Sequence, residues 1–156
     1  RNISDGSAMV TALRADGFSV AWRAADEPPR EATQIYVADA EDGLGLWSRL
    51  APITYLGGSF NDGLICDPFG PATVGSAVLA GPMITNNRVH YERLLQADAL
   101  QPVAKGADLG RAVEGLLATD LAAQLALRAW DVTSRGADAT NTLVALIYDY
   151  LDKVDF

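Results

Sequence analysis

Short apolar segments, each closed by glycine or proline and followed by a helical pattern, alternate along almost the whole chain. Ile53–Leu56 is an apolar run that ends at Gly57-Gly58, and residues 68–74 form a helical segment with proline in its first turn. Ala77–Ala80 is a second apolar run, and it lies between two glycines. Short strands that alternate with helices are typical of a parallel sheet covered by helices. The sequence therefore predicts an α/β fold, with a doubly wound, mostly parallel sheet.

The same alternation of strands and helices is predicted toward both ends of the chain. Before residue 53 the sequence predicts a helix that Ser4 or Asp5 caps and Gly17 stops, and a further helix over 44–50. After residue 80 it predicts a helix capped by Asn86 or Asn87, and then an amphipathic helix over 108–117. Two more helices should follow, one capped by Thr119 and one that begins after Gly136 and runs to Leu151. The remaining strands are expected at 18–22, 34–37 and 100–103.

Composition limits the classes of partner. The 156 residues are 49% apolar, which is enough for one hydrophobic core, and one domain is expected. A net charge of −8 argues against nucleic acid and against anionic membrane surfaces as direct partners. No apolar run reaches about 18 residues, so no membrane span is predicted.

Few single residues carry a chemical signal of their own. His90 is the only histidine, and we expect it on a solvated helix surface rather than in a catalytic role. One histidine with scattered carboxylates matches no metal-ligand spacing, so no metal is predicted. Cys66 is the only cysteine, which excludes an internal disulfide, and we expect it to be a small buried hydrophobe. The acidic residues Asp39, Glu41 and Asp42 either hold a ribose hydroxyl or favour the N-terminus of the following helix.

Five short motifs follow one another in an order that is more specific than any one of them. Residues 39–51 read Asp-Ala-Glu-Asp-Gly-Leu-Gly-Leu-Trp-Ser-Arg-Leu-Ala, and Gly-Gly-Ser follows at Gly57–Ser59. Residues 67–75 read Asp-Pro-Phe-Gly-Pro-Ala-Thr-Val-Gly. Gly81-Pro82 comes next with Asn86 downstream, and Arg-Gly-Ala occurs at 135–137.

This order resembles the C-terminal, nucleotide-binding half of the Kdo transferases, which add 3-deoxy-D-manno-octulosonic acid to lipid A precursors. The corresponding family motifs are Asp-Thr-x-Gly-Glu-Leu-Gly-Leu-x-Tyr-Arg-Leu-Ala, Gly-Gly-Ser, Asn-Pro-x-Glu-Pro-Ala-Ala-x-Gly, and a later Gly-Pro with a downstream Asn. Arg1 fits the first Arg of the family's Pro-Arg-His-Pro-Glu-Arg stretch. The resemblance covers nearly the whole chain.

The resemblance implies one half of a GT-B glycosyltransferase, in which two Rossmann-like halves face each other across a cleft. Residues 1–156 would be the C-terminal half, which binds the donor CMP-Kdo or a similar CMP-sugar without a metal. The acceptor, a lipid A precursor, and the catalytic carboxylate would belong to an N-terminal half outside this chain. The family also implies that the enzyme acts at the cytoplasmic side of a Gram-negative inner membrane. We also expect upstream residues or a partner chain to cover the edge of the sheet.

The resemblance also implies which residues meet the donor. Arg1 would approach its phosphate, and the turn at Asp42-Gly43 would face the nucleotide. The backbone of Gly57, Gly58 and Ser59 would approach the nucleotide closely. Asp67 and Gly70 stand at the Asn and Glu of the family's helix-opening motif, whose helix would offer backbone amides to an anion. Asn86 would line the cleft.

Three departures from the family bear on activity. Gly70 replaces the Glu that accepts hydrogen bonds from ribose, Gly43 replaces the Glu of Gly-Glu-Leu, and residues 64–67 are Leu-Ile-Cys-Asp instead of Gly-Gly-His/Gln-Asn. Each lost hydrogen bond to a charged acceptor costs about 1.5–3 kcal/mol, so we expect CMP binding to be millimolar or abolished. One alternative is a non-catalytic homologue that serves as a binding or scaffold module. Another is a different sugar-nucleotide enzyme, such as an epimerase.

Overall fold

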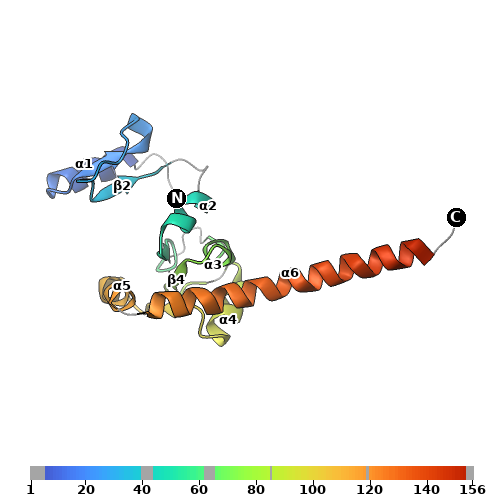
Figure 1. Cartoon of the computed structure of the whole chain (residues 1–156). Helices are drawn as coiled ribbons and strands as arrows, with labels where there is room; N and C mark the ends of the chain where they lie inside the picture. Colours follow the sequence, from blue (N-terminus) through green and yellow to red (C-terminus); the bar gives the residue numbers. More distant parts are fainter. Residues whose placement is uncertain (1–5, 40–43, 62–65, 85, 119, 154–156) are drawn as a thin grey trace. The chain divides into compact units, whose positions relative to one another are not determined.

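The chain forms two compact units, residues 1–44 and residues 45–156 (Figure 1). The structure is a computed structural model that describes residues 6–39, 44–61, 66–84, 86–118 and 120–153. The expected helix caps Ser4, Asp5 and Thr119 lie outside these residues.

The first unit is a small α/β arrangement. Helix α1 ends two residues before Gly17, which has a φ of +90°. Strands β1 and β2 pair in parallel, with Val20 opposite Ile35. The buried apolar residues Val10, Ala21 and Val37 come from all three elements. The bounds of the elements are α1 Gly6–Ala15, β1 Val20–Trp22, a 3-10 turn η2 Arg23–Ala25, and β2 Ile35–Val37.

The second unit is built on a three-stranded parallel sheet in the order β3-β4-β5. The strands β3 Ile53–Leu56 and β4 Ala77–Ala80 occupy the predicted residues, and β5 is the short strand Gln101–Pro102. The described strands thus form two parallel sheets, one in each unit. The helical elements are α2 Leu44–Leu50, which crosses the boundary between the units, α3 Phe69–Thr73, α4 Arg88–Gln96, η3 Gly106–Asp108, α5 Leu109–Leu117, and α6 Leu121–Lys153.

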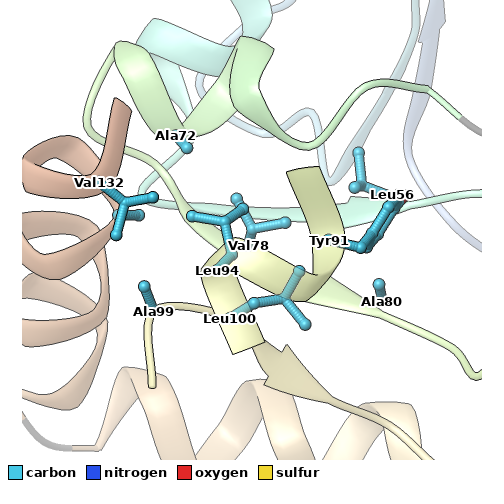
Figure 2. Packing of buried hydrophobic residues seen from close by; sticks show 10 residues of the cluster. Leu56, Ala72, Val78, Ala80, Tyr91, Leu94, Ala99, Leu100 and Val132 are labelled. Atoms are coloured by element: carbon cyan, nitrogen blue, oxygen red, sulfur yellow. The ribbon is translucent and has the colours of Figure 1, made fainter. Parts of the chain in front are cut away.

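Helices cover both faces of this sheet, as a doubly wound fold requires. All four residues of β4 are buried, and they alternate between the two faces because successive side chains of a strand point in opposite directions. Val78 and Ala80 pack with residues of α3, α4 and α6, including Tyr91 and Leu94 (Figure 2). The other face packs against α5 and the first turns of α6, through Leu79 and the residues Ala77, Val103, Leu116 and Leu125. Burial of each large apolar side chain contributes about 1.5–3 kcal/mol.

The last helix differs from the prediction. Instead of two helices separated near Gly136, α6 is one continuous helix of 33 residues. Its first half contributes Leu125 to one face of the sheet and Ala129 and Val132 to the other. Its second half carries exposed apolar side chains, namely Leu143, Val144, Leu146, Ile147, Tyr148, Tyr150 and Leu151.

The start of α4 also differs from the predicted helix cap. Asn87 stands at the cap position, as one of the two predicted residues, but its side chain makes no capping hydrogen bond. Asn87 instead adopts a left-handed backbone conformation, with a φ of +58°, in the turn before the helix. Asparagine tolerates this left-handed conformation better than most residues, so the turn and not the cap explains Asn87.

Candidate functional site

The carboxyl edge of the β3-β4-β5 sheet is the candidate site. The strands of a parallel sheet end at the same edge, where open α/β folds bind their ligands. The loop after β3 contains Gly57–Ser59 and leads to Asp67 and Gly70, and the loop after β4 contains Asn86. These predicted site residues therefore belong to two neighbouring loops of one unit. The predicted site residues Arg1, Asp42 and Gly43 lie outside the described residues.

Ser59 joins the ends of the two neighbouring strands and does not face a ligand with its side chain. It is fully buried, and its Oγ donates a hydrogen bond to the carbonyl oxygen of Leu56 at 2.6 Å. The same Oγ accepts one from the backbone N–H of Gly81 at 2.7 Å, and its carbonyl oxygen accepts one from Met83 at 3.0 Å. The serine of the Gly-Gly-Ser motif is therefore structural.

Gly57 and Gly58 present backbone at this edge. Gly57 is exposed, and a Cβ added there would meet no atom within 4 Å. Gly58 has a φ of +86°, a conformation that glycine adopts without strain. Gly57 thus leaves room for a ligand to approach the main chain after β3.

The first turn of α3 has no unpaired backbone amide to offer. Asp67 Oδ1 accepts the N–H of Phe69 at 3.0 Å, and the N–H of Gly70 donates to the carbonyl oxygen of Asp67 at 3.3 Å. Pro68 and Pro71 have no N–H group. The expectation that these amides bind an anion is therefore wrong, because Asp67 already takes the place of the anion.

His90 lies beside Asp67, although the sequence predicts a solvated helix surface for it. Its Nδ1 is 2.9 Å from Asp67 Oδ1, and its ring stacks on Phe69 with centroids 4.0 Å apart and an interplanar angle of 9°. An ionised carboxylate only accepts hydrogen bonds, so Nδ1 carries the proton. The imidazole side chain is 38% exposed. Arg93 adds a cation–π contact to Phe69, with its Cζ 5.4 Å from the ring centroid.

Tyr91 anchors the chain just before Asp67 from within the core. Its hydroxyl donates to the carbonyl oxygen of Cys66 at 3.2 Å. Burial raises the pKa of the Tyr91 phenol well above its ordinary value, so the hydroxyl stays protonated and keeps donating. Cys66 itself is exposed, so the expectation of a small buried hydrophobe is wrong. The carbonyl oxygen of Cys66 accepts the hydrogen bond from Tyr91, and the residue itself is exposed at the surface.

Two of the predicted residues at this edge have exposed positions. Gly70 lies in α3, and a Cβ there would meet no atom within 4 Å. Asn86 lies in the turn before α4. Sequence reasoning missed the contact between His90 and Asp67. One signal was present, because both residues follow the ends of adjacent strands.

Asp39 of the first unit has a structural partner. Its Oδ2 accepts a hydrogen bond from Trp22 Nε1 at 2.8 Å, and a Cβ on Gly6 would lie 2.9 Å from the same oxygen. Asp39 thus packs beside the first residue of α1. Glu41 and Asp42, the rest of the acidic run, lie outside the described residues.

The described ranges contain neither a candidate metal-binding cluster nor a candidate membrane-spanning helix. There, His, Cys, Asp and Glu form no group of three or more that is placed to hold a metal ion. Within the same ranges, no helix combines the length and the apolar character needed to cross a bilayer.

The comparisons with known proteins concern the fold. No family model matches the sequence. Among solved structures, the chain is similar to the C-terminal CMP-Kdo binding domain of WaaA from Acinetobacter baumannii, with a TM-score of 0.75 and 19% sequence identity. The similarity covers 85% of this chain and 69% of that domain's chain. It confirms the predicted Rossmann-like α/β fold.

Proposed function

We propose that this chain is the donor-binding half of a glycosyltransferase and holds a CMP-sugar of the Kdo type at the carboxyl edge of β3-β4-β5. One observation carries the proposal: the chain has the fold of a domain that is described as binding CMP-Kdo. The order of the Gly-Gly-Ser, Pro-x-Gly-Pro-Ala and Gly-Pro motifs supports it independently. Binding alone requires no metal in this scheme.

The geometry supports a nucleotide at this edge. Gly57 leaves its backbone open to a flat base or a ribose, and Asn86 has an exposed amide on the neighbouring loop. Such convergence of backbone and a few polar groups is typical of small-molecule sites in α/β folds. The family resemblance extends the same expectation to Arg1, Asp42 and Gly43, which lie outside the described residues.

The chemistry of transfer is assigned to the rest of the enzyme. We expect the acceptor-binding half to supply the catalytic carboxylate and to bind a lipid A precursor at the cytoplasmic side of the inner membrane. The chain by itself should bind donor and transfer nothing.

A non-catalytic homologue is the second candidate, and Gly70 favours it. The family's Glu at this position accepts hydrogen bonds from ribose, whereas here the space around the Cα is open. This candidate keeps the fold and a weak nucleotide site, but the full-length protein would show no transfer. Assay of the full-length protein with CMP-Kdo distinguishes the two.

Blocking the edge with a bulky side chain tests the site itself. We expect the chain to bind CMP with a Kd of about 1 mM and AMP more weakly, as measured by ligand-observed NMR. Gly57→Phe should weaken CMP binding at least about tenfold, because the new ring fills the approach to the backbone. It should fold normally, since its Cβ meets no atom within 4 Å and Gly57 lies outside the left-handed region.

Gly115→Phe is the matched control, because it adds the same bulk to an open glycine near the end of α5. It should bind CMP like the unmodified chain. No binding at several millimolar CMP, or equal binding by Gly57→Phe, would contradict the proposed site.

A further inference from the structure

The start of α3 poses a problem for an anionic ligand. Its first-turn amides are all paired within the chain or absent at proline, and the carboxylate of Asp67 lies at the helix start. A phosphate that approaches the start of α3 therefore meets a negative charge and no open amide of that helix. At this helix start, a donor for the phosphate must come from a side chain.

Resting on the proposed function, we propose that protonated His90 binds the phosphodiester of the CMP-sugar through Nε2–H and offsets the charge of Asp67. No motif of the sequence assigns a role to His90. The proposal makes it a ligand-binding residue whose orientation is set by Asp67 and Phe69.

The orientation of the imidazole follows from its contacts. Asp67 holds Nδ1 at 2.9 Å, and the parallel stack on Phe69 restrains the plane of the ring. The two nitrogens lie on different edges of the ring, so Nε2 points away from the carboxylate. Nε2 makes no hydrogen bond to any residue that the structure describes, and the side chain is 38% exposed. The nitrogen opposite Asp67 is thus available to a ligand.

The charge of the pair decides whether an anion binds. With a neutral imidazole, Nε2 is an acceptor and the pair carries the full negative charge of Asp67. With an imidazolium, the pair is neutral and Nε2–H donates a charge-assisted hydrogen bond to the phosphate. The anion therefore favours the protonated form, and its affinity must fall as the pH rises.

The charged groups described near His90 have other partners and do not supply the positive charge that we assign to it. On α4 itself, Arg88 is paired with Glu92 at 2.7 Å, and Arg93 lies over Phe69 and donates to the carbonyl oxygen of Val132. Among the described residues of the preceding loop, Cys66 is exposed and adjoins Asp67 in the sequence. From the core, the phenol of Tyr91, whose pKa is raised by burial, stays protonated.

The test uses the methyl ester of CMP, a phosphodiester whose charge is constant, whereas the second ionisation of a phosphate monoester occurs near pH 6. Its Kd is measured by NMR between about pH 5 and 8, the range in which histidines change charge. The unmodified chain should lose about tenfold in affinity across this range. His90→Gln should bind about tenfold more weakly at the low end and show less than a twofold dependence on pH.

Two further variants complete the test. Asp67→Asn keeps an acceptor for the N–H of Phe69 but removes the charge, so it should bind the ester severalfold more tightly at the high end of the range. Arg135→Gln removes an exposed positive charge on α6 that is paired with Asp131, and it should match the unmodified chain.

The outcomes separate this inference from the proposed function. If the ester binds but His90→Gln keeps both the affinity and the pH dependence, the inference fails and the donor site stands. If the unmodified chain binds no ester at any pH, the inference and the proposed function both fail. A thermal unfolding curve for each variant shows that the comparison is made on folded protein.

Discussion

Gly81→Ala should destabilise the second unit by about 3 kcal/mol, near the upper end of the usual cost of overpacking. A methyl group at this position would lie 2.7 Å from Phe60 Cδ1 and closer still to the carbonyl oxygen of Ser59. The latter is backbone and cannot rotate away, so the ends of β3 and β4 must separate. That movement also breaks the hydrogen bond from Gly81 N–H to Ser59 Oγ. Urea unfolding followed by circular dichroism measures the change.

Gly70→Ala is the control for this experiment. Gly70 also lies in the loop and helix region after β3, but its added methyl group meets no atom within 4 Å. Alanine in an exposed helical position should leave the free energy of unfolding unchanged or raise it by about 0.5–1 kcal/mol. Equal destabilisation by the two variants would show that the close approach of Gly81 to Ser59 does not hold the strand ends together.

Ser59→Ala should lower the free energy of unfolding by about 2 kcal/mol. The substitution leaves the N–H of Gly81 buried without its acceptor, and an unpaired buried donor costs about 1–3 kcal/mol. The carbonyl oxygen of Leu56 also loses its donor. The measurement is the shift of the urea midpoint at an unchanged m-value.

Thr73→Ala is the control for this experiment, because it removes a hydroxyl group that is exposed rather than buried. The Oγ1 of Thr73 donates to the carbonyl oxygen of Phe69 at 2.7 Å, but at an exposed position of α3. Its loss should change stability by less than about 0.5 kcal/mol. If Ser59→Ala were as mild as Thr73→Ala, and instead weakened CMP binding, then the serine would be a ligand contact and its structural role would be wrong.

The strands of the second unit were predictable because local signals agreed with tertiary structure. Glycine and proline bracket Ile53–Leu56 and Ala77–Ala80 closely, and both strands have the predicted ends. The continuity of α6 was not predictable in this way. A glycine inside a helix costs about 1 kcal/mol, and a helix of 33 residues overrides that local preference at Gly136.

The places of the predicted site residues along the fold were predictable, but their contacts were not. The motif order places Gly57, Ser59 and Asp67 after one strand, and the structure confirms that they follow β3. The buried Ser59 accepts a hydrogen bond from the backbone N–H of Gly81. Asp67 contacts His90, which lies 23 residues further along the chain. Contacts between segments this far apart leave no periodic trace in the sequence, so local patterns could not reveal them.

If the carboxyl edge of β3-β4-β5 holds a cytidine nucleotide, an NMR titration of the chain with CMP should locate it there. We expect saturable shifts in the amides of Gly57, Gly58, Phe69, Asn86 and His90. The amides of the exposed residues 143–151 on α6 should not move. Absence of shifts at several millimolar CMP on folded protein, or shifts confined to other parts of the chain, would contradict the proposed site.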